Sequence, residues 1–398
     1  MTNLPQGWEV KKLEEIANIK GGKRLPKGEN LLDNNTKFAY IRVADFQDNG
    51  TINLQNIKFI NENTYNVLKN YKIYDDNLYI SIAGTIGKSG IIPKELNGAI
   101  LTENAVKLEY IQNNISNKFM YFFTLSNIFK TQIQTSTKIV AQPKLAITRL
   151  KQIQIPLPPL KEQERIVGIL DESFAKIDES IKILEQDLLN LDELMQSALQ
   201  KAFNPLKDNA KENYKLPQSW EWKSLEEISE NISAGGDKPK NCTESKTAKN
   251  QIPVYANGVN NNGLVGYTDK ATIIKPSLTI SARGTIGFVC IRKKPYFPIV
   301  RLISLIPCEN ILCLHYLYFC LNFFIAKGEG SSIPQLTIPK FKSLQIPLPP
   351  LKEQEQIAEH LDFVFEKAKA LKELYTKELK DYEELKQSLL DKAFKGEL

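Results

Sequence analysis

The chain has 398 residues, of which 42% are hydrophobic and 25% are charged, and its net charge is +6. This composition is ordinary for a globular protein, and the length predicts about two domains. The most apolar run, residues 311–326, is too short to cross a membrane, and the first residues lack the pattern of a secretory signal. We therefore expect a cytoplasmic protein with no membrane partner. An odd number of cysteines, five, argues against a disulfide framework.

An internal repeat divides the sequence into two copies. LPQGW at 4–8 returns as LPQSW at 216–220, and IPLPPLKEQE at 155–164 returns unchanged at 346–355. The offset between copies falls from 212 positions at the first motif to 191 at the second, and it then stays at 191. Length changes are therefore confined to the part before the proline motif, and the segment after it is copied without insertion. The order is globular part, helix, globular part, helix.

The first globular part, residues 1–155, has the pattern of short strands with tight turns. Residues rich in β-branched and aromatic side chains occur at 38–43 and 78–82, bounded by Asn, Asp and Gly. An apolar stretch at 118–125 has a helical pattern. We expect a mixed, mostly antiparallel sheet with a few short helices.

The second globular part, residues 216–346, repeats this pattern. Strands are predicted at 252–255, 271–274 and 278–281, and an apolar helix is predicted at 312–322. The same mixed sheet is expected here.

Each proline motif opens a long helical pattern with a heptad seam. Proline cannot lie inside a helix but suits the positions just before its first turn. We therefore predict spacer helices in residues 156–204 and 347–398, with a connector at 205–215. The second seam shows one slip, near Leu379. The seam residues are Leu170, Phe174, Ile177, Ile181, Leu184, Leu188 and Leu191 in the first helix and Leu361, Leu371, Leu379, Leu385 and Leu389 in the second.

Two apolar seams of similar length in one chain predict an antiparallel intramolecular pair. The expected fold class is α+β: two mixed α/β domains in an internal repeat, pseudo-two-fold symmetric, separated by an antiparallel coiled coil of two long helices. Pairing of the helices with other chains is the alternative.

Signals of enzymatic chemistry are largely absent from this sequence. There is no glycine-rich phosphate loop, and there is no Asn-Pro-Pro-aromatic or Asp-Pro-Pro-aromatic tetrad for amino methylation. His315 and His360 have no neighbouring nucleophile arrangement. Cys308, Cys313 and Cys320 with His315 lack the usual zinc spacing, and the matching stretch of the first copy has no Cys or His. We predict no catalytic residue and no metal site.

Each copy has three candidate binding loops, and the first of them combines glycine with basic residues. The paired glycines of the GTIG motif permit close approach of the backbone to a ligand. Two matched binding domains on a rigid spacer suit a long ligand read at two places, and double-stranded DNA is the natural candidate. The loops lie at 21–27, 84–87 and 135–144 in the first copy and at 235–240, 284–287 and 330–336 in the second.

The ordered set of motifs resembles the specificity subunit of type I restriction-modification systems. The matching segments are both LPQ-x-W motifs, the Gly-Gly-Lys segment, YIRVAD at 40–45, both GTIG motifs, GSSIPQ at 330–335 and both IPLPPLKEQE motifs. The resemblance implies two target-recognition domains that each read half of a split DNA sequence. It also implies helices that space these domains.

The same resemblance implies partners. Two adenine-methyltransferase subunits would dock with the help of the helices, and restriction subunits would join through them. S-adenosylmethionine, ATP and magnesium would belong to those partners, so that this chain would hold no cofactor and would be a non-catalytic subunit.

With DNA as the ligand, Lys and Arg are expected to neutralise phosphates while loop side chains read base edges in the major groove. Arg283 corresponds to Ala83, so the two domains are expected to read different half-sites, with Arg283 on a guanine. The base-reading candidates are Arg42, Lys88 and Gln142 in the first domain and Asn257, Arg283 and Gln335 in the second. The other candidates for DNA contact are Lys23, Arg24, Lys27, Lys138, Lys144, Lys238, Lys240 and Lys340.

Two other functions remain open from the sequence. One is a scaffold without sequence specificity, in which the coiled coil is the functional part. The other is the recognition subunit of a related restriction enzyme whose partner chain carries both nuclease and methylase. A methyltransferase gene and a large helicase-nuclease gene nearby would favour the type I interpretation.

Overall fold

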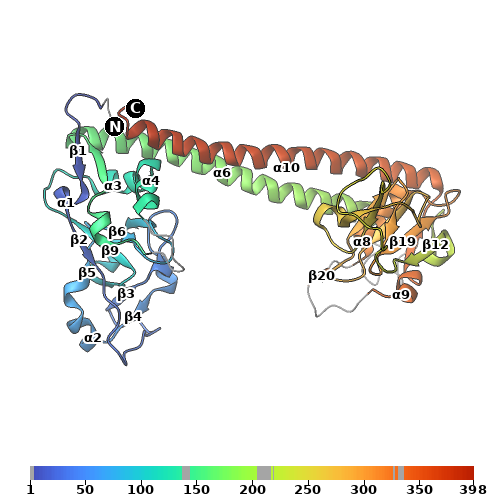
Figure 1. The fold of residues 1–398 in the computed structure, drawn as a ribbon, viewed down its shortest axis with the longest axis horizontal. Coiled ribbons are helices and arrows are strands. Elements are labelled where there is room, and N and C mark those ends of the chain that lie inside the picture. Colours follow the sequence, from blue (N-terminus) through green and yellow to red (C-terminus); the bar gives the residue numbers. More distant parts are fainter. Residues whose placement is uncertain (1–3, 137–143, 204–216, 218, 326–327, 330–335) are drawn as a thin grey trace. The chain divides into compact units, whose positions relative to one another are not determined.

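The computed structural model describes residues 4–136, 144–203, 217, 219–325, 328–329 and 336–398. The chain forms two units, which are described one at a time below (Figure 1). The first contains residues 1–184 and 377–398, and the second contains residues 185–376. Each unit therefore combines one globular part with a portion of both long helices. The predicted connector at 205–215 lies outside the described residues.

The globular part of the first unit is organised around a four-stranded antiparallel sheet. Its strand order is β2-β9-β6-β7, so the two neighbours of β9 come from well separated parts of the sequence. β6 is buried along its whole length, as its run of β-branched and aromatic residues predicts. The strands are β2 (Ala17–Gly21), β6 (Leu78–Ser81), β7 (Ser89–Ile91) and β9 (Ala105–Tyr110).

A second sheet in this unit has the order β4-β3-β8-β5 and contains one parallel pair, β3 with β8. The expected mixed, mostly antiparallel arrangement is therefore present. The elements of this layer are β3 (Ala39–Ile41), β4 (Lys58–Phe59), α2 (Glu62–Val67), β5 (Lys72–Ile73) and β8 (Ala99–Leu101).

Three helices follow these sheets, and the aromatic side chains of two of them form much of the core. Ser116 caps α3 by accepting a hydrogen bond from the backbone N–H of Phe119. Phe119 and Phe123 are fully buried and contact the ring of Phe394, at the end of the last long helix. The helices are α3 (Asn117–Leu125), α4 (Asn127–Ser136) and α5 (Ile147–Leu150).

The second unit repeats the central sheet with the order β12-β19-β15-β17, again antiparallel throughout. A smaller sheet, β14-β13-β18, contains the parallel pair of β13 with β18. The elements are β12 (Ser229–Ala234), β13 (Ile252–Tyr255), β14 (Leu264–Thr268), β15 (Ser277–Ile280), β17 (Val289–Arg292), β18 (Phe297–Pro298), β19 (Ile303–Pro307), α8 (Leu314–Phe324) and α9 (Ile338–Lys342).

The strand predicted at 271–274 is wrong. Ile273 makes only an isolated bridge with Tyr296, and Ile274 is 71% exposed. Pro276 has no N–H with which to continue a ladder, so the segment contributes one buried side chain and no strand.

Each globular part is closed by a short strand pair that joins its beginning to its end. β1 (Glu9–Lys12) pairs with β10 (Gln154–Leu157), and β11 (Glu221–Ser224) pairs with β21 (Gln345–Leu348). A four-residue helix follows the first strand of each pair, α1 (Leu13–Ile16) and α7 (Leu225–Ile228). The long helices begin at Leu160 and Leu351, directly after the two prolines of each motif, because the residues up to 157 and 348 are extended.

The long helices, α6 (Leu160–Phe203) and α10 (Leu351–Ala393), pair antiparallel within each unit. In the first unit Lys386 forms an ion pair with Asp178, and in the second Lys372 forms one with Asp192. Between the first ion pair and the second, the α6 residue is 14 positions later in the sequence and the α10 residue is 14 positions earlier. The register is thus the same in both units.

Burial along α6 follows the predicted seam positions. Leu170, Ile177, Leu184 and Leu191 are buried, and Phe174, Ile181 and Leu188 are half-buried. These residues alternate in steps of four and three, as a coiled coil requires.

The predicted seam of α10 needs a correction. Leu361 is buried and Leu379 and Leu389 are half-buried, but Leu371 and Leu385 are 38% and 45% exposed. The seam positions are taken by the next residues, Lys372 and Lys386, whose stems are half-buried while their ammonium groups reach Asp192 and Asp178. The heptad therefore continues without the predicted slip, because lysine was not recognised as a seam residue.

A buried glutamine fixes the start of each long helix to its globular part. Gln163 is 1% exposed and donates to the carbonyls of Asn114 (3.0 Å) and Pro158 (2.9 Å), while its oxygen accepts from Ser116 N (2.8 Å). Gln354, fully buried, makes the same three bonds, to Ile311 O, Pro349 O and Cys313 N, at 2.8–2.9 Å. We call each set of bonds a glutamine socket.

Candidate nucleic-acid interface

Both GTIG motifs form the same hairpin loop between two strands of the central sheet. Gly87 N donates to Ser81 O (2.9 Å) in the first unit, and Gly287 N donates to Ser281 O (3.1 Å) in the second. All four glycines have positive φ, between 68° and 89°, a conformation that side chains disfavour. Among the described residues, none has a heavy atom within 4 Å of a Cβ built at Gly84 or Gly284. Neither hairpin glycine is therefore packed against the described part of the chain.

The third loop of each domain runs beside its GTIG hairpin. Lys144 makes a β-bridge with Ala83, and Leu336 N donates to Ala282 O (3.2 Å). In the second unit β16 (Thr285–Ile286) also pairs with β20 (Gly328–Glu329). The structure thus brings together two of the loops selected from the sequence. The candidates Lys138, Gln142 and Gln335 lie outside the described residues.

The glycine-rich segment of each domain is pressed against the backbone of a neighbouring turn. A Cβ on Gly22 would lie 2.1 Å from Thr102 O, and one on Gly235 would lie 2.6 Å from Ile299 N. Only glycine fits at these two positions. The basic candidates that follow, Lys23, Arg24 and Lys27 in the first domain and Lys238 and Lys240 in the second, are all exposed.

Arg24 is engaged with a neighbour in the first domain. Its Nε donates to Glu103 at 2.7 Å, although the side chain is 78% exposed. Burial alone would raise the pKa of Glu103, but hydrogen bonds from Arg24 and Thr102 outweigh that effect and lower it. The carboxylate thus holds Arg24 at the surface, where water screens the pair.

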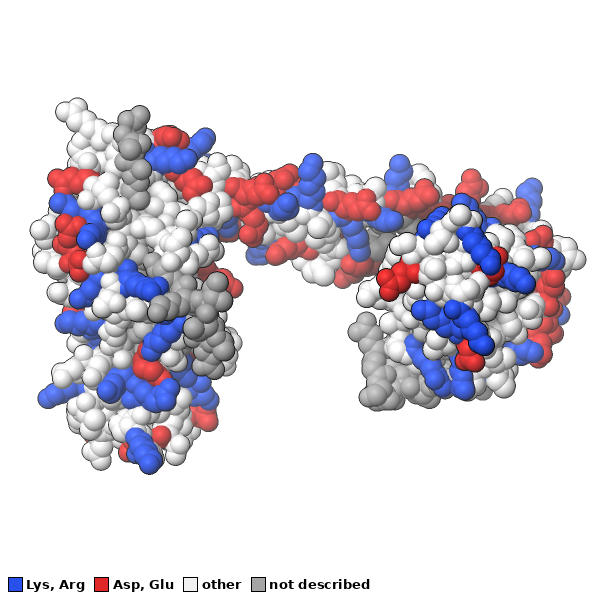
Figure 2. Space-filling model, viewed as in Figure 1, with Lys and Arg blue, Asp and Glu red and all other residues white. Residues whose placement is uncertain are grey.

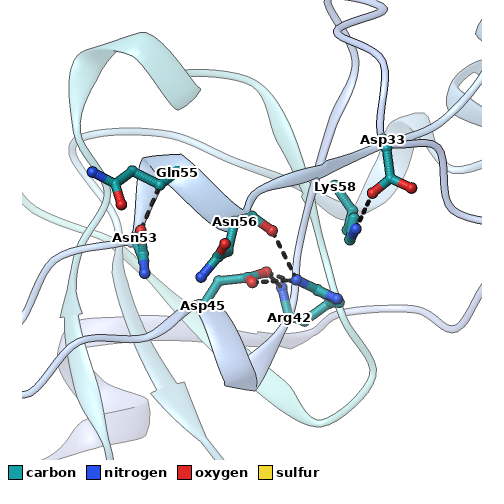
Figure 3. A network of polar contacts seen from close by, with 7 residues as sticks. All are labelled: Asp33, Arg42, Asp45, Asn53, Gln55, Asn56 and Lys58. Carbon is teal, nitrogen blue, oxygen red and sulfur yellow. Dashed lines mark hydrogen bonds and ion pairs between the residues drawn. The ribbon is translucent and has the colours of Figure 1, made fainter.

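Arg42 occupies a different environment from the one expected of a base-reading residue (Figure 3). Its guanidinium makes two hydrogen bonds to Asp45, at 2.5 and 3.0 Å, and a third to Asn56 O at 2.9 Å. Asp45 is 1% exposed, and its hydrogen bonds raise the pKa of Arg42 above the ordinary value. We therefore assign Arg42 to the internal support of the loop at 43–57 and leave it out of the proposed interface.

Lys88 follows the first GTIG motif and pairs with Asp48 at 2.8 Å. Both residues line a cleft of about 380 Å³ between the hairpin and α4. Lys130 of α4 lines the same cleft. Lys88 thus lies at the hairpin, as predicted, with a carboxylate beside it.

In the second domain Asn257 joins three loops. Its side-chain oxygen accepts from Ala282 N (2.8 Å), and its amide nitrogen donates to Val300 O (2.6 Å). Gly258 N donates to the hydroxyl of the buried Ser281 (3.3 Å). Asn257 therefore positions the loop that carries Arg283, and Arg283 itself is exposed at the hairpin tip. The structure gives Asn257 a positioning role beside the predicted reader.

Arg292, which the sequence did not single out, supports the loop at 257–263. It is 8% exposed and donates to Asn262 O (2.6 Å) and to the Thr279 hydroxyl (3.0 Å). Its guanidinium also stacks 3.6 Å above the ring of Tyr255. Asn261 and Asn262 have positive φ, 48° and 51°, so the loop is held in a conformation that a free chain disfavours.

Lysine and arginine exceed acidic residues in both globular parts, whereas the helices are acidic. Residues 1–155 carry 20 basic against 13 acidic residues (+7), and residues 216–346 carry 15 against 9 (+6). Residues 156–204 carry 5 against 10 (−5), and residues 347–398 carry 9 against 12 (−3). Figure 2 shows basic side chains over the visible face of each globular part and mixed charges along the helices. Lys340, on α9, is exposed. The basic surface thus belongs to the domains that carry the hairpins.

Metal-ligating side chains do not gather into a site in the described parts of the chain. Within those ranges no group of three or more His, Cys, Asp or Glu could hold a metal ion. His315 lies 2.6 Å from Asp362, and the matched position of the first unit holds Lys118 at 2.6 Å from Asp171. These are corresponding links between the globular helix and the long helix. No helix among the described residues is long and apolar enough to cross a membrane.

The family of the chain follows from comparison with known proteins. The family model described as the type I restriction modification DNA specificity domain matches residues 5–188 and again residues 217–380. The chain belongs to this family. The resemblance noted in the sequence is thereby confirmed, and each repeat is one specificity domain, with a hairpin, a glutamine socket and a basic surface of its own.

Relatives and solved structures of this specificity family agree over most of the chain. A putative type I specificity subunit of Mycoplasma pneumoniae is 29% identical, covering 88% of this chain and 87% of its own. A solved chain from a study of assembly and conformational transition of the type I R-M system has a TM-score of 0.81 at 20% identity, with both chains fully covered. The HsdS subunit of Thermoanaerobacter tengcongensis has a TM-score of 0.62 at 20% identity, covering 100% and 98%.

These likenesses confirm the predicted fold class: two mixed α/β recognition domains in an internal repeat, with two long helices as coiled-coil spacers.

Proposed function

We propose that this specificity protein recognises a split DNA sequence, one half with each domain. The observation that carries the proposal is that the two domains share the same supporting structure but differ in the loops that it supports. Both domains have the same sheet order, the same hairpin and the same glutamine socket. The supports of their loops differ, Arg42 with Asp45 in one and Arg292 with Tyr255 in the other. A constant frame with different loops suits two readers of different half-sites.

In this proposal the exposed lysines and arginines of each domain neutralise phosphates and set the register on the duplex. Arg283 reads a guanine from the tip of the second hairpin, because a guanidinium matches the O6 and N7 acceptors in the major groove. Lys88, at the other end of the first GTIG motif, is the candidate reader at the hairpin of the first domain. Lys138, Gln142 and Gln335 remain candidates in the third loops.

The proposal also assigns partners to the helices. Two adenine-methyltransferase subunits would be positioned by the chain, and translocase-nuclease subunits would be recruited through them. S-adenosylmethionine, ATP and magnesium would be bound by those subunits, and this chain would act as a non-catalytic component in the cytoplasm, where the DNA is. The solved relative comes from a study of assembly of the type I R-M system, which supports partners of this kind.

Methylome sequencing tests the proposal. Strains with the gene, without it, and with the gene restored are compared for methylated adenines. We expect one split motif that disappears on deletion and returns on complementation. A motif that persists without the gene, or complementation that restores no split motif, contradicts the proposal. A dependent motif made by a partner that carries methylase and nuclease in one chain would support the related-enzyme alternative.

A further inference from the structure

A strained turn in the second domain was not visible in the sequence. Residues 299–302 connect β18 to β19, and Leu302 N donates to Ile299 O at 3.1 Å. The two central residues, Val300 and Arg301, have φ values of 53° and 60°. Two successive positive φ values in a turn closed in this way are typical of type I′, for which Asn-Gly is the favoured sequence. A β-branched residue such as valine is strongly disfavoured there.

Burial does not offset this strain. The Val300 side chain is 52% exposed, and Arg301 is also exposed. Residues held in disfavoured backbone conformations cluster at functional sites. Since neither side chain is buried in the core, we look for the reason for the strain in an interaction with a molecule outside the chain.

Three hydrogen bonds from two neighbouring segments hold the turn. Val300 N donates to Gly236 O and Arg301 N to Gly235 O, both at 2.8 Å, and Val300 O accepts from the side-chain amide of Asn257 (2.6 Å). The close approach at Gly235 leaves no room for a side chain at that position. The turn therefore has a fixed position rather than a range of conformations.

The turn lies at the same end of the domain as the second hairpin. Asn257, which holds Val300 O, also accepts from Ala282 N, the residue before Arg283. Asn257 thus links the turn to the hairpin loop that carries Arg283.

The matched turn of the first domain is different. Two hydrogen bonds identify residues 102–105 as the matched turn. Ala105 N donates to Thr102 O (3.2 Å), as Leu302 N does to Ile299 O. Gly22 N donates to Ala105 O, as Gly235 N does to Leu302 O. Glu103 stands in the place of Val300, and it is not among the non-glycine residues with positive φ. It binds Arg24 rather than projecting alone. The strained turn is specific to the second domain.

We propose that the Val300–Arg301 turn determines part of the second half-site, with Arg301 donating two hydrogen bonds to a base edge and Val300 packing beside it. The inference rests on the proposed function. A phosphate contact tolerates a flexible side chain on a relaxed turn, so it gives no reason for a strained backbone. Paired hydrogen bonds to a guanine require the planar guanidinium in one orientation, which a fixed turn supplies.

The test replaces the turn with the sequence that its backbone prefers. The double variant Val300→Asn with Arg301→Gly is expected to keep or raise the unfolding temperature. In the methylome of a strain complemented with it, one or two positions of the second half-site lose definition, with base discrimination lowered roughly tenfold or more. The first half-site stays unchanged. Arg301→Lys, which keeps the charge but loses the planar fork, is expected to relax the same positions.

Lys270→Ala is the matched control, since Lys270 is an exposed basic residue of the same domain, and loss of a phosphate contact weakens binding to all sequences alike without changing base preference. It is expected to leave the motif intact. An unchanged motif with the double variant overturns the inference, and so does Arg301→Lys with a full wild-type motif, because charge alone would then suffice. If the wild-type chain itself specifies no split motif, the proposed function fails. If it specifies one that ignores both turn variants, only the inference fails.

Discussion

The two recognition domains share a frame and differ in what the frame carries. The central sheet, the GTIG hairpin and the glutamine socket recur with the same hydrogen bonds at matched positions. The second sheet, which contains the parallel strand pair, has four strands in the first domain and three in the second. The repeated parts are those that connect a domain to its helix, and the varied parts are those near the hairpin tips.

The loop supports show how the difference arises. In the first domain a buried carboxylate, Asp45, holds Arg42 against the loop at 43–57. In the second domain a buried arginine, Arg292, supports the loop at 257–263 by donating a hydrogen bond to Asn262 O. One frame thus accepts two unrelated supports, so a reading surface can change without changing how the domain joins the helix.

The largest effects are expected from removing these supports. Arg42→Met leaves the buried Asp45 without its partner, and Arg292→Met removes two hydrogen bonds and a stacked cation. We expect each substitution to lower the free energy of unfolding by about 2–4 kcal/mol. The expected cost of Arg42→Met is smaller than that of breaking a fully buried ion pair, because Arg42 is partly exposed. Each is expected to blur only its own half-site in the methylome.

Hydrogen exchange measured segment by segment gives the stability readout for each domain separately. Loss of protection in both domains from one substitution, or blurring of the opposite half-site, would contradict the view that each domain supports its own loops. Lys94→Met and Lys293→Met, at exposed positions, are the controls.

The glutamine sockets are expected to behave alike in the two domains. Gln163→Leu and Gln354→Leu each leave a buried N–H and two carbonyls without their partner, and we expect each to cost about 2–3 kcal/mol. Denaturant unfolding measures the effect. Gln356→Leu, an exposed glutamine two residues further along α10, is the control and is expected to change stability by less than about 0.5 kcal/mol. A large effect at one socket and none at the other would contradict the claim that the two sockets are equivalent.

The smallest effect concerns the turn at Glu103. Its pKa is lowered in the folded chain, so its contribution is present above the unfolded pKa of about 4.3 and is lost as the pH falls through the folded value. Glu103→Gln is expected to reduce stability at pH 7 by less than about 1 kcal/mol, and the difference from wild type is expected to vanish as the pH falls below the folded pKa of Glu103.

Thermal unfolding across that pH range measures the effect of Glu103. The matched change Val300→Gln removes no carboxyl group and is expected to leave the shape of the pH profile unaltered. A pH-independent difference for Glu103→Gln would show that the carboxylate is not stabilised by Arg24 and Thr102.

Much of the architecture was predictable because repetition and periodicity are written directly in the sequence. The copied proline motif located both helices, and the four-three spacing from Leu170 to Leu191 located the seam of α6. The α10 seam was misassigned at Leu371 and Leu385, since a hydrophobic pattern does not reveal that Lys372 and Lys386 bury their stems and pair with α6.

The candidate interface was harder to predict from the sequence than the architecture. Exposed basic residues of the glycine-rich loops could be selected by type and position, but the role of Arg42 depends on the burial of Asp45. The carboxylate three residues on was the available signal. Arg292 acts through Asn262, 30 positions earlier, and the strain at Val300 is a property of the backbone alone. Such features follow from tertiary contacts rather than from local sequence.

Duplicating one domain tests the central claim most directly. Residues 216–346 are replaced by a second copy of residues 1–155, and both helices with Gln163 and Gln354 are retained. Asn114 and Ser116 of the copied domain then take the places of Ile311 and Cys313 as partners of Gln354. The methylome is sequenced in a strain that has the duplicated chain as its only copy. If each domain reads one half-site through its own loops, the new motif contains the first half-site twice. A motif that still contains the second half-site contradicts the account, because that half would then be read by something other than residues 216–346.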